Sequence, residues 1–190
     1  MYEVAFSHDG CRILCNVNRA EWTTRGHQLS PPYTDKDLFL EKIQSAAYSP
    51  NENEIVCGLV DGTVMIWNME INKRHILDSH TWAVRSISFS TDSTRIASGS
   101  DDRTVCIWDP KLKGPGMINE KVDLGLLRVA LSHDGRWIVT ASLGHIQVWR
   151  VTETMKTNEL IIVDDVLSLA LSRDSSHVTF RGLNQWRPLP

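Results

Sequence analysis

One short motif recurs along the chain at an almost constant interval, and no other feature limits the possible folds as strongly. Each copy is a small run of mainly apolar residues that ends in serine and is followed by turn-forming residues. The intervals between the serines are 42, 41, 42 and 40 residues, and the serines are Ser7, Ser49, Ser90, Ser132 and Ser172. So regular a period over 190 residues predicts a series of similar units, each packed against its neighbours.

Tryptophan recurs with the same period. Trp67, Trp108 and Trp149 follow the repeated serine by 18, 18 and 17 residues, while Trp22 and Trp186 follow it by 15 and 14. Five of the seven tryptophans are therefore in register with the repeat. A bulky aromatic residue that occurs once per unit is typical of packing between units and not of a cofactor site. We therefore expect Trp67, Trp108 and Trp149 to be core tryptophans.

The third repeat shows the local pattern most clearly. Residues 86–90, 94–98 and 104–108 are short runs rich in β-branched and aromatic residues, and polar turn-forming clusters separate them. A fourth, less regular run follows each of these tryptophans, as at 74–77. A period of roughly 40 to 45 residues with four short strands is typical of a propeller blade. The sequence thus predicts an all-β chain, a β-propeller of about five four-stranded antiparallel blades.

The repeats organise the chain as one domain. Its units are expected at about 1–25, 38–72, 73–112, 113–153 and 154–190. An insertion loop at about 26–37 contains the Pro31-Pro32 pair. The stretch 37–44 that follows fits either a turn of helix or the outer strand of the first blade.

The end of the third repeat carries the most specific motif. It contains the turn Ser98-Gly99-Ser100-Asp101-Asp102, and it closes with Trp108-Asp109. With His80 upstream, this repeat resembles a full WD repeat. The chain is similar to the WD-repeat β-propeller family, and in particular to the repeat region of fungal WD-repeat signalling proteins. The resemblance is weaker in the second and fourth repeats, and weakest in the first and last, which lack the acidic turn before tryptophan.

In the WD-repeat family, a histidine, a serine or threonine, an aspartate and a tryptophan form a hydrogen-bonded chain inside the blade. The resemblance therefore implies a structural tetrad of His80, Ser98, Asp102 and Trp108. The second repeat keeps the aspartate as Asp61 but has Cys57 in place of the serine. The fourth has Thr140 at the serine position and no aspartate. We expect the tetrad to be complete in the third repeat alone.

Serine, histidine and aspartate together also suggest a catalytic triad, but the sequence favours a structural role. A buried indole N–H needs an acceptor, and the hydroxyl, imidazole and carboxylate groups provide a chain that ends in a tight turn. No Gly-x-Ser-x-Gly motif, phosphate-binding loop or dinucleotide fingerprint is present. We expect no catalytic residues and no cofactor, so the protein is not expected to be an enzyme.

The four cysteines raise the question of a metal site. Cys11 and Cys15 have a spacing that zinc sites allow, but Cys57 and Cys106 lie inside strand-like runs, and no second cluster completes four ligands. We therefore expect reduced thiols and no bound metal.

Charge and hydropathy narrow the class of partner. The formal net charge is −3, which gives no electrostatic reason to expect nucleic acid or an anionic membrane as a partner. The longest apolar runs are far too short to cross a bilayer, and no secretory signal is visible. We expect a cytoplasmic location, with a nuclear one as the alternative.

The resemblance also implies where partners bind. In WD-repeat propellers the usual partner surface carries the loop before the inner strand and the turn before the blade aspartate. Carried over by alignment, the residues of this face are Tyr2, Lys42, Gln44, Val60, Ala83, Arg85, Asp101, Leu127, Asp165 and Leu167. Their mixture of charges and apolar groups suits a protein or peptide better than a small molecule. For Leu127 and Leu167, burial under a loop is an equally good interpretation.

Two function classes follow. The first is a non-catalytic protein–protein interaction scaffold. The second is the repeat region of a larger nucleotide-binding signalling regulator whose N-terminal module is not in this chain. Because five units fill only part of the usual ring, we expect an open or incomplete propeller. Self-association, or completion of the ring by another chain, is also expected, because unpaired strand edges can pair with another chain.

Overall fold

The computed structural model describes residues 4–7, 9–15, 20–23, 43–68, 70–71, 73–77, 80–110, 118–121, 126–142, 145–151, 156–162, 166–172 and 177–182. Every regular element in these residues is a β-strand. None of them forms a helix of the length and hydropathy needed to cross a membrane. The expected insertion at 26–37 lies outside the described residues, as do Tyr2, Lys42, Asp165 and Trp186.

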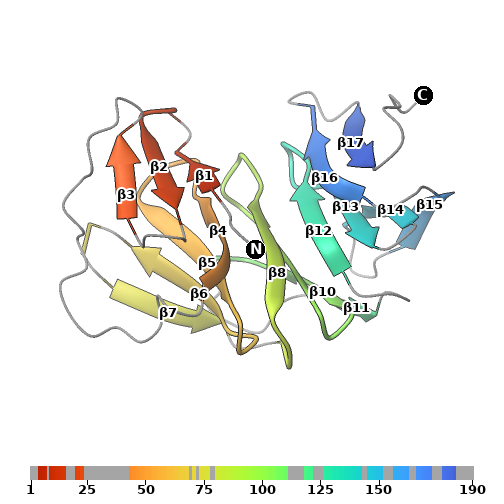
Figure 1. Ribbon diagram of the computed structural model, residues 1–190, viewed down its shortest axis with the longest axis horizontal. Coiled ribbons are helices and arrows are strands. Elements are labelled where there is room, and N and C mark those ends of the chain that lie inside the picture. Colours follow the sequence, from red (N-terminus) through yellow and green to blue (C-terminus); the bar gives the residue numbers. More distant parts are fainter. Residues whose placement is uncertain are drawn as a thin grey trace.

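The strands pair into five antiparallel sheets in chain order (Figure 1). The first contains β1 (Val4–Phe6), β2 (Arg12–Cys15) and β3 (Ala20–Thr23). The second contains β4 (Ile43–Tyr48), β5 (Glu54–Leu59), β6 (Val64–Asn68) and β7 (Lys73–Leu77). The third contains β8 (Val84–Phe89), β9 (Ile96–Ser100), β10 (Thr104–Trp108) and β11 (Ile118–Lys121). The fourth contains β12 (Leu126–Leu131), β13 (Trp137–Ser142), β14 (His145–Arg150) and β15 (Lys156–Ile162), and the fifth contains β16 (Val166–Leu171) and β17 (Val178–Gly182).

The sheets stand side by side in an open arc. The first strand of each sheet contacts the first strand of the next, in the order β1, β4, β8, β12 and β16. In Figure 1 the first sheet (red) and the fifth (blue) stand at the two ends of this arc and do not meet. This confirms the expected all-β arrangement of antiparallel, propeller-like sheets that do not close into a ring.

The sheets are offset from the sequence units by one strand. The unit expected at 73–112 begins with β7, but β7 pairs with β6 and so completes the second sheet. In the same way β11 completes the third sheet and β15 the fourth. Of the ambiguous stretch 37–44, the two described residues, Ile43 and Gln44, begin the first strand of the second sheet.

The central strands are buried along their whole length because both faces of their sheets are covered. All five residues of β9 and all five of β10 are buried. In a sheet that is covered on both sides, exposed and buried residues are not expected to alternate along a strand. The apolar cluster between the second and third sheets includes Val64, Ile66, Leu77, Ile87 and Trp108. Similar clusters lie between the third and fourth sheets and between the fourth and fifth.

The repeated serine holds the turn that joins the first two strands of a sheet. In the third sheet, Ser90 Oγ donates to Asp92 Oδ1 at 2.6 Å and accepts the Arg95 N–H at 2.9 Å. The third residue after the serine has a left-handed backbone, with φ between 57° and 66°, in four of the turns; these residues are Gly10, Glu52, Ser93 and Gly135. The sequence motif therefore records a hydrogen-bonded turn of fixed shape.

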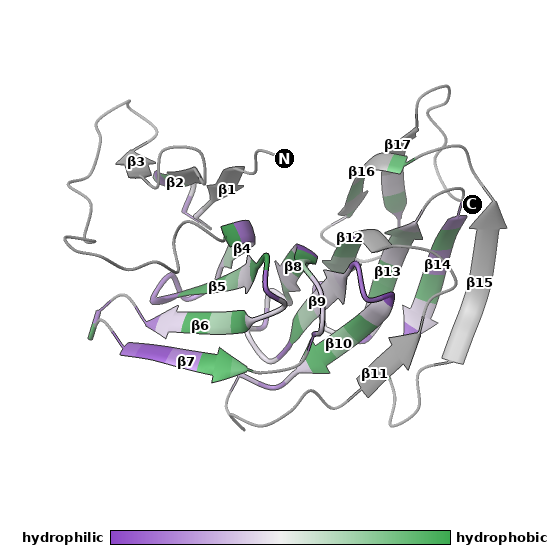
Figure 2. Ribbon diagram, turned by 60° about the horizontal axis from the view of Figure 1, so that its bottom comes forward, coloured by the Kyte–Doolittle hydropathy of each residue, from purple (hydrophilic) through white to green (hydrophobic). Residues whose placement is uncertain are grey.

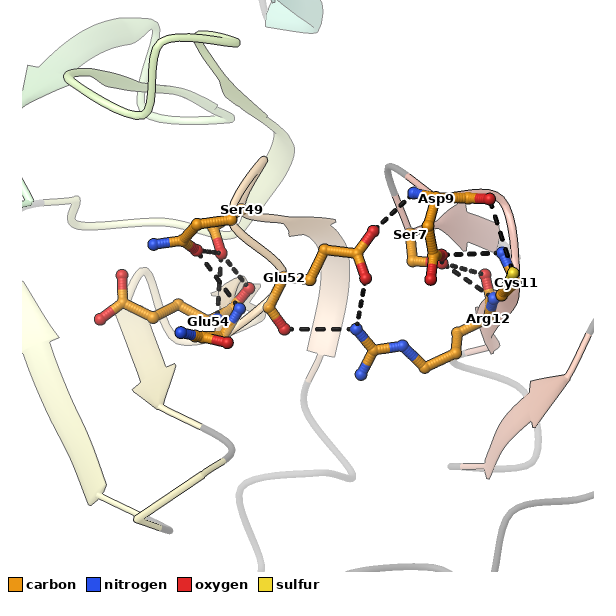
Figure 3. A network of polar contacts seen from close by, with 9 residues as sticks. Ser7, Asp9, Cys11, Arg12, Ser49, Glu52 and Glu54 are labelled. Atoms are coloured by element: carbon orange, nitrogen blue, oxygen red, sulfur yellow. Dashed lines mark hydrogen bonds and ion pairs between the residues drawn. The ribbon is translucent and has the colours of Figure 1, made fainter.

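Polar contacts between these turns link neighbouring sheets. Figure 3 shows Glu52 of the second sheet reaching the first sheet, where the Asp9 N–H and the Arg12 guanidinium both donate to its carboxylate. The Arg12 Nη2 to Glu52 Oε2 distance is 2.9 Å. Between the third and fourth sheets, the buried Ser86 Oγ accepts the Val129 N–H at 3.0 Å. These contacts join residues about one repeat apart, so they set how the sheets are placed relative to each other.

Candidate interaction face

Four of the predicted face residues occupy the same structural position in successive sheets. The first strand of each of the second to fifth sheets breaks register at one residue, and these residues are Gln44, Arg85, Leu127 and Leu167. A β-bulge of this kind adds one residue to the strand and redirects its side chain. The equivalence found by repeat alignment thus corresponds to a repeated irregularity of the backbone.

Arg85 connects two sheets at this position. Its Nε donates to Asp101 Oδ2 at 2.8 Å, Nη2 donates to the same oxygen, and Nη1 donates to Gln44 Oε1 at 3.3 Å. The hydrogen bonds to Asp101 raise the pKa of Arg85, a group that is charged at neutral pH in any case. The two side chains of the ion pair are 37% and 30% exposed, so the pair contributes little to stability and is accessible to a partner.

Trp82 is a prominent member of this surface that repeat reasoning missed. Its side chain is 65% exposed. Its backbone is nevertheless held firmly, because Ser100 Oγ donates to the Trp82 carbonyl at 2.8 Å and the flanking Thr81 N–H donates to Asp102 at 2.9 Å. The one clue in the sequence was that Trp82 is one of the two tryptophans that do not follow the repeat spacing, so it was not expected to be a core residue.

Val60 lies in a turn that packs against the Trp82 segment. A Cβ added to Gly62, in the same turn, would lie 2.2 Å from the His80 carbonyl oxygen and 3.1 Å from that of Trp82. Val60 itself is 46% exposed. On the Arg85 side, the Asp101 N–H donates to the Ala83 carbonyl at 3.0 Å. We use the term interaction face for Gln44, Val60, Trp82, Arg85 and Asp101.

The other predicted face residues are only partly covered by the structure. Tyr2, Lys42 and Asp165 lie outside the described residues. Leu127 and Leu167 are placed by backbone register, whereas their side chains are not described. Whether either leucine is exposed therefore stays a prediction.

Beneath the face, the structure brings the four tetrad residues together. Trp108 Nε1–H donates to Ser98 Oγ at 3.0 Å, and Ser98 Oγ lies 2.8 Å from His80 Nε2. His80 Nδ1 lies 3.1 Å from Asp102 Oδ2. The indole N–H can only donate, so the Ser98 hydroxyl accepts from Trp108 and donates its own hydrogen to His80 Nε2. The histidine proton is therefore on Nδ1, which donates to Asp102. Each polar group in this series of four side chains then has a hydrogen-bonding partner.

Sequence reasoning did not include Thr104, which is part of the same network. Its Oγ1 donates to Asp102 Oδ1 and lies 2.9 Å from His80 Nδ1. Although burial opposes ionisation of Asp102, hydrogen bonds from Thr104 and from the Thr81 N–H lower its pKa below 3.8. The carboxylate therefore anchors both the β9–β10 turn and the segment that carries Trp82.

The other core tryptophans have different polar partners. Trp149 Nε1–H donates to Thr140 Oγ1 at 2.8 Å, so the fourth sheet keeps this part of the tetrad. In the second sheet, the Arg74 guanidinium lies 5.0 Å from the ring centre of Trp67. Trp67, Trp108 and Trp149 are all buried, at 3%, 0% and 6% exposure.

The geometry offers no catalytic chemistry at the tetrad. Ser98 is fully buried and His80 is 6% exposed, so a substrate does not reach either group. Within the described parts of the chain, no three His, Cys, Asp or Glu side chains are grouped so as to hold a metal ion. The accessible chemistry is that of the face: a rigid indole, an apolar side chain and an exposed ion pair.

Burial of His80 predicts that the protein loses stability in weak acid. Burial lowers the pKa of His80 below 6.5, although Asp102 opposes the shift. The unfolded chain therefore binds this proton first, and stability falls as the pH drops below about 6.5 toward the folded-state pKa. Urea unfolding at pH 7.5 and pH 5.5 measures the fall, which should be smaller in His80→Gln. The control is Arg136→Gln, because the Arg136 side chain is 77% exposed and an arginine stays charged at both pH values, so it should leave the fall unchanged. An equally large loss of stability at pH 5.5 in His80→Gln would show that burial of His80 is not its cause.

The comparisons agree with this architecture. The family model described as WD domain, G-beta repeat matches residues 40–68, 71–109 and 123–150. WD repeat-containing protein VIP3 of Arabidopsis thaliana is 34% identical over 59 residues, which are 30% of this chain and 18% of the relative. The β-propeller domain of Myceliophteria thermophila Cps50 (Swd1) superposes with a TM-score of 0.64 at 14% identity, over 73% of this chain and 48% of that domain. The chain thus spans about half of the solved propeller and under a fifth of the curated relative.

Proposed function

Because the chain belongs to the WD domain, G-beta repeat family, we propose that it is a non-catalytic scaffold that binds other proteins through the interaction face. Propellers of this family generally serve as protein-binding scaffolds. The observation that carries the proposal is Trp82, a large aromatic side chain that is 65% exposed on a hydrogen-bonded backbone. Exposed indoles on rigid supports are typical of the residues that dominate binding energy at protein interfaces.

The neighbours of Trp82 suit a protein partner. Val60 adds apolar area, while Arg85, Asp101 and Gln44 provide hydrogen-bonding groups of both kinds. An apolar centre with a polar margin is the usual composition of a protein-binding surface. A small-molecule site would instead need a concave, mainly apolar pocket.

The charge of the chain and the chemistry of the face support narrower proposals. With a net charge of −3, the partners are proteins or peptides and not nucleic acid or membrane surfaces. We also propose a role in the cytoplasm, with the nucleus as the alternative, that involves no catalysis and no cofactor. The open ends of the arc permit self-association or completion by another chain.

The test compares partner capture by matched variants. Proteins captured from native cells by the wild-type chain are identified, and the binding of each purified candidate is then measured. Trp82→Ala and Arg85→Glu should each weaken a true partner about tenfold or more. Arg136→Glu is the control, because its side chain is 77% exposed in a turn outside the interaction face.

Thermal melts separate binding from folding. Both face variants should melt like the wild type, because their side chains are exposed or only half-buried. A partner bound equally well by the wild type, Trp82→Ala and Arg85→Glu would refute the assignment of this face. Loss of folding in Arg85→Glu would show that Arg85 has a structural role.

A further inference from the structure

Large apolar side chains are exposed in two regions of the described residues. Val60 and Trp82 belong to the interaction face. Ile71 and Ile76 lie instead on the β6–β7 hairpin and are 65% and 51% exposed. Ile71 precedes the outer strand of the second sheet and Ile76 lies within it, so the interaction face does not account for them.

β7 is an edge strand. The order of the second sheet is β4-β5-β6-β7, and within the described residues no strand pairs with the outer side of β7. Figure 2 shows β7 as the outermost strand of its sheet, hydrophilic at its start and hydrophobic at its end. An edge of this kind presents unpaired backbone N–H and C=O groups, which can accept an added strand.

The side chains along this edge have a definite order. Between Ile71 and Ile76 come Lys73, Arg74 and His75, and Lys73 is exposed. Glu70 is the one acidic residue in the described segments 70–71 and 73–77. The edge is therefore apolar at both ends and basic in the middle.

We propose that β7 is a second docking site, which binds an extended acidic segment of a partner protein by strand addition. The backbone groups of β7 would pair with the added strand, acidic side chains would lie opposite Lys73, and apolar side chains would cover Ile71 and Ile76. A lysine alone on an edge serves to prevent unwanted pairing. The exposed Ile71 and Ile76, toward the two ends of the same edge, have the opposite effect, because exposed apolar side chains favour association.

The test uses the full chain and synthetic peptides about seven residues long, which is enough to span a strand of this length. The first peptide has apolar ends and glutamates at its centre, and the second has lysines in place of the glutamates. The acidic peptide should bind and slow hydrogen exchange of the Lys73–Leu77 amides. The lysine peptide should bind about tenfold more weakly, and added salt should reduce the difference.

Variants locate the site. Lys73→Glu should weaken the acidic peptide about tenfold, because attraction becomes repulsion. The matched control is Lys121→Glu on β11, the edge strand of the third sheet, which should leave the affinity unchanged. Trp82→Ala should also leave it unchanged, so failure of this proposal is distinguishable from failure of the interaction face.

Three results would overturn the proposal. They are absence of binding by the acidic peptide, unaltered affinity in Lys73→Glu, and protection from exchange that maps to residues other than β7. If the acidic peptide does not bind, the role of Lys73 is to protect this edge against unwanted strand pairing.

Discussion

Trp108→Ala should lower the free energy of unfolding by about 3–5 kcal/mol, the usual cost of removing a buried tryptophan from a core. Trp108 is fully buried and belongs to the apolar cluster between the second and third sheets. Its removal leaves a cavity at this boundary. It also removes the N–H donor to Ser98 Oγ, which begins the hydrogen-bonded chain through His80 to Asp102.

Urea unfolding at neutral pH measures this loss. Trp82→Ala is the matched control, since it removes the same side chain from a position that is 65% exposed. The control should change stability by no more than about 0.5 kcal/mol. Wild-type stability in Trp108→Ala would show that the boundary between these sheets is not organised around this indole.

Gly62→Ala should be comparably severe, with a loss of about 2–5 kcal/mol from backbone strain and overpacking together. Gly62 has a φ of 92°, in the left-handed region that side chains disfavour. An added Cβ would lie 2.2 Å from the carbonyl oxygen of His80, an approach that only movement of the backbone can relieve. That movement would separate the turn that carries Val60 from the segment that carries Trp82.

Gly10→Ala separates the two causes. Gly10 also has a positive φ, 66°, but an added Cβ there has no neighbour within 4 Å. Its cost should therefore be the conformational strain alone, about 1–2 kcal/mol. Equal losses in the two variants, measured by the same urea unfolding, would show that close packing at Gly62 has no energetic consequence. Gly62→Ala should also weaken partners of the interaction face, whereas Gly10→Ala should not.

Much of the fold was predictable because the repeat is a local pattern. The serine, the turn residues and the tryptophan recur at fixed spacing, and each acts within its own sheet. The Ser90 hydroxyl, for example, bonds to residues two and five positions away. The membership of His80, Ser98, Asp102 and Trp108 in one hydrogen-bonded chain followed from the family resemblance of a single repeat. The alignment of Gln44 with Arg85 depended on the same period.

The remaining features arise where one sheet meets the next, and a repeat pattern does not encode those contacts. The Arg85 bond to Gln44 joins residues 41 positions apart, and the Arg12 bond to Glu52 joins residues 40 apart. Trp82 is out of register, so only the placement of its loop shows that its indole points to solvent. The contact of Thr104 with His80 was unpredictable for a similar reason, because it depends on how the β9–β10 turn packs against the His80 segment.

The sequence by itself determined the repeat, the strands and the positions of the turns, and the resemblance of one repeat to a known family implied the residues of the hydrogen-bonded chain. The physical reason is that these depend on backbone preferences and on contacts among residues of one unit. The tertiary structure alone decided which residues bridge successive sheets, as Glu52 and Arg85 do, and which large apolar side chains stay exposed. Exposure and strand pairing at a sheet boundary depend on which neighbour covers each surface, and that follows from the relative placement of whole sheets.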